Sequence, residues 1–157
     1  MTSPDLHQWP SASMGYRRSE VSAVVGSGDA SWERASEQVL RWGVKTASGF
    51  SVDSPGPVSV GDRVLVTAHF LGLRVLEPVE VVAVVHEPDR AGFAYRTLPG
   101  HPVSGEEAFI VHRAGSTVHL TIRSLTRPAP QQPWRLFYPA LLVLQKLVRR
   151  RYLRALG

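Results

Sequence analysis

The sequence predicts an α+β domain in which a run of antiparallel strands is followed by a long C-terminal helix. Three observations support this prediction. β-Branched and aromatic residues alternate with turn signals through the middle of the chain, apolar residues at helical spacing occur before and after that run, and no strand–helix alternation typical of a parallel sheet is present. The 157 residues, 43% hydrophobic and 20% charged, suit one folded domain.

The first predicted elements are a strand and a helix. Valine and alanine residues predict a strand over residues 16–25, and the glycines of Gly26-Ser27-Gly28 permit a tight turn after it. The following helix is predicted to end at Gly43, since glycine commonly terminates helices. Residues 49–61, rich in Ser, Pro and Gly, are predicted to form a loop. The apolar stripe of this helix consists of Trp32, Ala35, Val39 and Trp42.

Six β-rich stretches separated by turn signals follow this loop. Their alternation of apolar and polar residues predicts strands with one face toward a core. Ala114-Gly115-Ser116 predicts the hairpin turn between the last two. The stretches cover residues 63–70, 73–76, 79–86, 91–98, 106–113 and 117–126.

The last element is predicted to be a helix that packs one apolar face on the sheet. Its apolar side chains recur every three or four residues, and its arginines lie mostly off that stripe. We expect burial of the stripe to hold the helix on the sheet. The stripe consists of Phe137, Leu141, Leu144, Val148 and Tyr152.

Composition excludes several classes of protein. The chain contains no cysteine, so disulfides, cysteine nucleophiles and thiolate metal sites are absent. The longest apolar stretch, Leu136 to Leu144, is too short to span a bilayer. Residues 1–13 are polar, contain two prolines and predict a loose tail, which leaves residues 14–157 as the single domain. These features predict a cytoplasmic protein, and no oligomeric state is predicted.

No cofactor or metal is expected. Gly26-Ser27-Gly28 lies between a strand and a helix, but a dinucleotide fingerprint would need a third glycine where Ser31 stands. None of the six histidines has a metal-binding helical spacing. His112 and His119 are predicted to face each other across the hairpin, where two ligands alone make a poor site.

Charge is divided along the chain. Residues up to Glu107 carry 9 basic and 13 acidic side chains, a net of −4, whereas residues from Ala108 onward carry 9 basic and no acidic ones, a net of +9. The basic third is expected to form a solvated face that balances the acidic part. An anionic membrane, phosphate or acidic partner is the alternative. No nucleic-acid partner is expected, since Arg149-Arg150-Arg151 lacks the interleaved aromatics that stack on bases.

The segment from Gly92 to Phe109 carries the candidate chemistry. Strand alternation places Glu107 on the inward face, and a carboxylate in an apolar interior is a candidate acid or base. Tyr95 and His101 are the other catalytic candidates. A structural alternative stays open for each: Glu107 pairs with an arginine or backbone N–H groups, His101 is a turn residue, and Tyr95 is a core aromatic.

These motifs resemble the signature of a known family. The matching residues are Gly26-Ser27-Gly28, Trp32, Ala35, Trp42, Gly92 to Tyr95, Thr97 to Pro102, Gly105 to Phe109, Arg127-Pro128, Gln145 and Tyr152. They resemble the uncharacterised domain-of-unknown-function family nineteen-ninety of bacteria and plants. One departure is Arg96, where the family usually carries glycine. Membership brings no established activity or catalytic residues.

The family is similar to the START-like, helix-grip superfamily. That resemblance implies a curved antiparallel sheet wrapped around a long C-terminal helix, with a short helical segment after the first strand and an apolar cavity between sheet and helix. Members of the superfamily bind lipids, sterols and other apolar ligands, and some act as polyketide cyclases. Fold alone does not determine function.

The leading hypothesis is therefore a binding module for an apolar small molecule or lipid-like ligand, held between the sheet and the helix over residues 134–156. One alternative is a cyclase or proton-transfer enzyme with Glu107 as base and Tyr95 or His101 as acid. Another is a regulatory or peripheral-membrane protein that uses its basic C-terminal helix and does not insert stably into the membrane. The expected ligand-binding residues are Phe93, Tyr95, Thr97, His101, Glu107, Phe109, Val111, Leu120, Ile122, Leu141 and Leu144.

Overall fold

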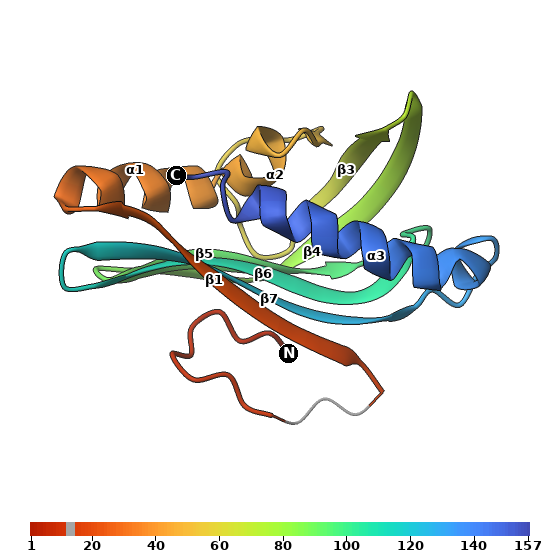
Figure 1. The fold of residues 1–157 in the computed structure, drawn as a ribbon, viewed down its shortest axis with the longest axis horizontal. Helices are drawn as coiled ribbons and strands as arrows, with labels where there is room; N and C mark the ends of the chain where they lie inside the picture. Colours follow the sequence, from red (N-terminus) through yellow and green to blue (C-terminus); the bar gives the residue numbers. More distant parts are fainter. Residues whose placement is uncertain (12–14) are drawn as a thin grey trace.

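The computed structural model describes residues 1–11 and 15–157, and in them the strands form one antiparallel sheet of seven strands in the order β1-β7-β6-β5-β4-β3-β2 (Figure 1). All three helices lie on one face of this sheet, which bends toward them. The predicted α+β class is confirmed. The elements are β1 (Arg17–Ser27), α1 (Asp29–Val39), α2 (Gly43–Ala47), β2 (Ser51–Val52), β3 (Arg63–Phe70), β4 (Leu73–Glu87), β5 (Arg90–Thr97), β6 (Val103–Ala114), β7 (Thr117–Pro128) and α3 (Trp134–Tyr152).

The predicted strands are present, with two main differences in extent, and the loop predicted over residues 49–61 contains the short strand β2. Residues 73–76 and 79–86 belong to one strand, β4, because the carbonyl of Pro78 still accepts the Leu98 N–H although proline has no N–H of its own. Strand β6 begins at Val103, before the predicted start at residue 106, because Val103 already pairs with Pro128 at the end of β7. The β3 boundaries agree with the prediction.

The predicted helix end at Gly43 is wrong. Helix α1 ends at Val39, Trp42 adopts a left-handed backbone with φ 64°, and Gly43 begins α2. A Cβ on Gly43 would lie 2.5 Å from the carbonyl oxygen of Gln38, so the glycine permits the chain to fold back closely on α1. This bend positions α2 over the sheet.

The predicted packing of α3 also needs correction. Tyr152 is buried, but Phe137 is 50% exposed, and Leu141, Leu144 and Val148 are only partly buried. The physical reason is that the middle of the helix lies over a cavity instead of over filled core. Burial of the whole stripe therefore does not hold α3 in place.

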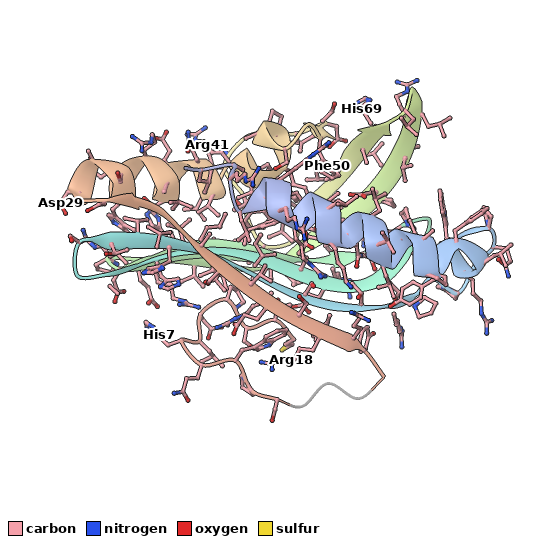
Figure 2. The ribbon with its side chains drawn as sticks, viewed as in Figure 1. His7, Arg18, Asp29, Arg41, Phe50 and His69 are labelled. Atoms are coloured by element: carbon pink, nitrogen blue, oxygen red, sulfur yellow. The ribbon has the colours of Figure 1, made fainter. Side chains whose placement is uncertain are left out.

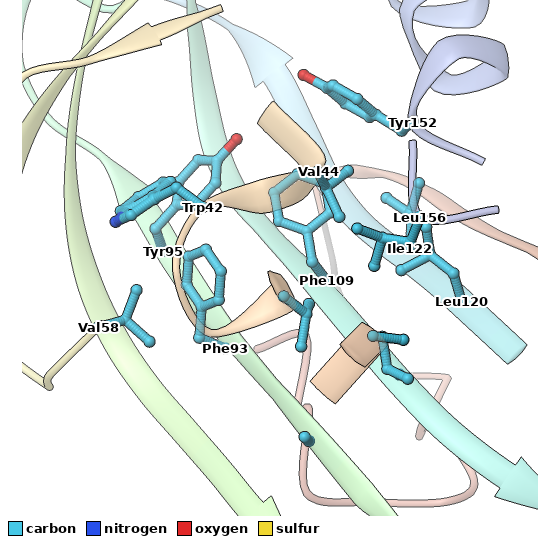
Figure 3. Packing of buried hydrophobic residues seen from close by; sticks show 14 of the residues in the cluster. Trp42, Val44, Val58, Phe93, Tyr95, Phe109, Leu120, Ile122, Tyr152 and Leu156 are labelled. Carbon is cyan, nitrogen blue, oxygen red and sulfur yellow. The ribbon is translucent and has the colours of Figure 1, made fainter. Parts of the chain in front are cut away.

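The main core lies between the sheet and the two N-terminal helices (Figure 3). The rings of Trp42 and Phe93 meet edge to face at 4.7 Å between centroids, and those of Phe109 and Tyr152 do so at 5.3 Å. Tyr152 thus joins the C-terminal end of α3 to this core.

Residues 1–11 lie against the opposite face of the sheet, which the helices leave uncovered (Figure 2). The buried Arg90 side chain donates to the Pro4 carbonyl at 2.6 Å, and the buried Arg123 side chain donates to the Ser3 carbonyl at 2.7 Å. The indole of Trp9 donates to the carbonyl of Met1 at 2.9 Å. Over these residues the expected loose tail makes specific contacts, and its residues 12 and 13 lie outside the described part of the chain.

Gly92→Ala is expected to lower the free energy of unfolding by at least about 2 kcal/mol, because its Cβ would overlap the Phe109 carbonyl oxygen and lie 2.9 Å from the Cα of Ile110. Gly56→Ala is the matched control, since nothing lies within 4 Å of its added Cβ. Urea unfolding measures both changes. Equal effects of the two substitutions would contradict the close strand packing at Gly92.

Candidate functional site

A cavity of about 210 Å³ opens between α3 and the sheet. It exceeds an engineered 150 Å³ protein cavity that binds benzene. Its apolar wall includes Phe50, Val75 and the α3 residues Leu141, Leu144 and Val148. Its polar wall includes Lys45, Glu77, Tyr95, Thr97, His101, Glu107 and Tyr152, which come from α2, four segments of the sheet region and α3.

The structure brings six of the predicted site residues together around this cavity: Tyr95, Thr97, His101, Glu107, Leu141 and Leu144. The other five, Phe93, Phe109, Val111, Leu120 and Ile122, belong to the main core and do not line it. Along their strands these five residues lie nearer to α1 than the cavity-lining residues do, by at least one inward-facing position. Phe109 backs the polar wall, since its ring centroid lies 6.2 Å from that of Tyr95.

The ammonium group of Lys45 is the centre of the polar wall. The side chain is 4% exposed, and its Nζ donates a hydrogen bond to the hydroxyl of Tyr152 at 2.7 Å. It also lies 3.5 Å from the carboxylate of Glu77 and 3.8 Å from that of Glu107. Two acidic groups and a phenol therefore compensate one buried cation.

Burial alone would lower the pKa of Lys45, but the surrounding tyrosine hydroxyls and the carboxylates of Glu77 and Glu107 outweigh it and raise that pKa well above the usual value. Burial, together with the nearby carboxylates, raises the pKa values of Tyr95 and Tyr152. At neutral pH the site therefore holds a charged ammonium and two neutral phenols.

Tyr95 and Glu107 form the second part of the polar wall. The Tyr95 hydroxyl donates to Glu107 Oε1 at 2.7 Å across the paired strands β5 and β6. Glu107 makes its contacts with Tyr95 and Lys45 and none with an arginine among the described residues. Figure 3 shows the Tyr95 and Tyr152 hydroxyls on the same side of the core.

His101 and Thr97 have structural duties at the cavity edge. Nδ1 of His101 accepts the backbone N–H of Val103 at 3.1 Å, and Thr97 Oγ1 accepts the N–H of Gly105 at 3.0 Å. Burial, and then the charge of Lys45, lowers the pKa of His101 to about 3. The imidazole is therefore neutral at pH 7, which weakens its case as a general acid.

Two residues of the polar wall, Lys45 and Glu77, were not predicted from the sequence. Lys45 lies after the expected helix end, and only the unpredicted helix α2 turns it toward the sheet. Glu77 lies in the gap between the predicted strands 73–76 and 79–86, which form the single strand β4 in the structure. The one available signal for Lys45 was its rarity, since the chain has a lysine at only one other position, Lys146.

Within the described part of the chain, neither a cluster of metal-ligating side chains nor a membrane-spanning helix is found. In residues 1–11 and 15–157, no three His, Asp or Glu side chains form a group that could hold a metal ion. No helix in the same residues is long and apolar enough to cross a membrane. His112 and His119 do stack, with ring centroids 5.1 Å apart, but on strand positions remote from the cavity lining.

Comparison with known proteins identifies the family. The profile of the family described as Domain of unknown function (DUF1990) matches residues 2–155. The chain belongs to this family. The predicted resemblance is thereby confirmed, and the family's match includes the N-terminal segment that packs on the sheet.

Family relatives come from bacteria and plants. A UPF0548 protein of Deinococcus radiodurans is 39% identical over 119 residues, which cover 67% of this chain and 59% of that protein. A UPF0548 protein of Arabidopsis thaliana is 28% identical over 122 residues, which cover 73% of this chain and 60% of that protein. The matches thus span about three fifths of the length of these relatives.

Solved structures show the same fold at low sequence identity. A hypothetical protein of Helicobacter pylori has a TM-score of 0.68 at 12% identity, over 99% of this chain and 96% of that one. Ara h 8.0201 has a TM-score of 0.56 at 12% identity, over 88% and 95% of the two chains. Ginseng major latex-like protein 151 from Panax ginseng has a TM-score of 0.51 at 15% identity, over 87% and 97%. The fold is START-like, with a curved sheet around the C-terminal helix.

The low pKa of His101 predicts a pH-dependent stability. Unfolded histidine takes up a proton near pH 6.5, whereas folded His101 does so only near pH 3, so stability is lost as pH falls from about 6.5 toward 3. At pH 5 this one group costs about 2 kcal/mol relative to pH 7. His101→Gln should reduce the decline measured by urea unfolding between pH 7 and pH 5. An unchanged decline in the variant would contradict the assignment.

Proposed function

We propose that this protein binds an apolar small molecule that carries a neutral polar group, in the cavity between α3 and the sheet. The observation that carries the proposal is the cavity itself, of about 210 Å³, which has an apolar wall on α3 and a compact polar wall opposite. Ligand sites commonly combine a mostly apolar surface with a few placed polar groups. We include a cytoplasmic location in this proposal, because the chain uses no disulfide.

The polar wall favours a neutral ligand group over a charged one. Lys45 is already compensated by Glu77 and Glu107, so a ligand carboxylate would compete with two carboxylates of the protein. A ligand ammonium would compete with Lys45 for the same two carboxylates. Burying an uncompensated charge is costly in free energy, whereas a ligand hydroxyl or carbonyl brings no charge into the site.

Two polar atoms of the cavity lining support a hydroxyl in particular. Thr126 Oγ1 and Gln145 Oε1 are buried and have no hydrogen-bond partner among the described residues, and both residues line the cavity. The Thr126 hydroxyl donates or accepts, and the Gln145 oxygen accepts. Because an unsatisfied buried polar atom costs free energy, a ligand hydroxyl that bonds to either one gains affinity.

The test uses 2-naphthol as a probe in isothermal titration calorimetry. Saturable binding to one site is expected for the original chain. Leu144→Trp should abolish it by filling the cavity, whereas Val143→Trp, at a position 62% exposed on the same helix, should leave it unchanged. Circular dichroism checks that both variants fold. Equal binding to both variants would refute the proposed cavity site.

The hydroxyl preference has its own prediction. 2-Naphthol should bind about five-fold or more tightly than naphthalene, which matches about 1 kcal/mol for one hydrogen bond. Gln145→Leu combined with Thr126→Val should remove that difference while naphthalene still binds. A preference that persists in the double variant would show that these two atoms do not recognise the hydroxyl.

A second candidate function is proton-transfer catalysis of the cyclase type. The observation in its favour is the convergence of Glu107, Tyr95 and Lys45 at one cavity wall, with the Tyr95–Glu107 hydrogen bond at 2.7 Å. Glu107 would act as base and the phenol of Tyr95 as a proton donor toward a carbonyl. Turnover of an enolisable ketone, detected as deuterium uptake from heavy water and lost in Glu107→Gln, would favour this candidate over binding alone.

A further inference from the structure

The solvent face of α3 has an apolar stripe that no described residue covers. Leu136, Val143 and Leu147 are 73%, 62% and 54% exposed, and Ala140 is exposed between them. Their spacing of three or four residues places these side chains on one side of the helix. That side is opposite Leu141, Val148 and Tyr152, which face the cavity and the core.

Basic residues continue and flank this stripe. Arg150 and Arg151 follow Leu147 by three and four residues, so they extend the same side toward the C-terminus. The exposed Lys146 lies beside it. From Ala108 to the end of the sequence the chain has no acidic residue. The solvent face of α3 therefore combines apolar and cationic character without any compensating anion of its own helix.

A second exposed apolar feature projects on the same side of the sheet. The β3–β4 hairpin rises on the side of the sheet that carries the helices (Figure 1). Leu71 in its turn and Leu73 at the start of β4 are 86% and 67% exposed. Residues of these two strands, Ala68 and Val75, line the cavity together with Leu147. The α3 stripe and the hairpin tip therefore flank the same cavity opening.

We propose that the solvent face of α3 and the β3–β4 tip dock on the surface of an anionic lipid bilayer. Apolar side chains of this kind enter the headgroup boundary, while Lys and Arg bind anionic headgroups. Charge argues against a second copy as the occupant. A symmetric contact of this face would bury the cationic groups of both α3 helices in one interface, with no acidic residue on either helix to compensate them.

Vesicle co-sedimentation tests the proposal on the full chain. At about 0.1 M salt we expect binding to vesicles of phosphatidylcholine and phosphatidylglycerol, and at least about ten-fold weaker binding to phosphatidylcholine alone. Raising the salt to about 0.5 M should weaken the binding to the anionic vesicles, because surface charges are then screened.

Two variants and a matched control locate the surface. Leu136→Asp with Val143→Asp, and separately Lys146→Glu with Arg150→Glu, should each weaken binding about ten-fold or more, and none of these residues lines the cavity. Val60→Asp is the control, at a position 65% exposed and remote in sequence from both features, and should bind as the original chain does.

Three results would overturn the proposal. The first is no binding to anionic vesicles, and the second is equal loss in the Val60→Asp control and the α3 variants. The third is a dimer of the original chain in light scattering that Leu136→Asp with Val143→Asp converts to monomer, which would make a second copy the occupant of the stripe. Binding of 2-naphthol is measured in parallel, so that failure of the membrane surface and failure of the cavity site remain distinguishable.

Discussion

The buried ammonium group of Lys45 is the interaction on which the arrangement around the cavity depends. An isolated charge at 4% exposure would be strongly unfavourable. Its partners Glu77, Glu107 and Tyr152 come from β4, β6 and α3, which are distant in the sequence. Satisfying this one cation therefore fixes α2, the sheet and the end of the C-terminal helix relative to one another.

The cavity follows from how α3 is attached. The helix is held at its C-terminal end, where Tyr152 joins the aromatic core and Lys45. Its middle turns present Leu141 and Leu144 to the cavity, and Val148 borders the cavity while also packing against the main core. A close-packed interior would fill such space with its own residues. The same helix leaves its outer apolar stripe to solvent, and Leu147 belongs both to that stripe and to the cavity lining.

The sequence was most informative where periodicity decides the structure. Alternation along β5 and β6 predicted that Tyr95 and Glu107 face inward, and the register pairs them directly. It could not predict Lys45, because the left-handed backbone at Trp42 that starts a second helix leaves no periodic signal. Local alternation also could not separate core from cavity: Phe109 and Glu107 share a face, and only the position of α3 above them decides which one borders open space.

Ligand binding in the cavity is tested most directly by an isotope-filtered nuclear Overhauser experiment on methyl-labelled protein with bound 2-naphthol. If the cavity is the binding site, the probe should show contacts to methyl groups of Leu141, Leu144 and Val148, which line the cavity. Contacts confined to Leu136 and Val143 on the outer side of α3 would contradict it, because the apolar molecule would then occupy the exposed stripe and the cavity would not be its site.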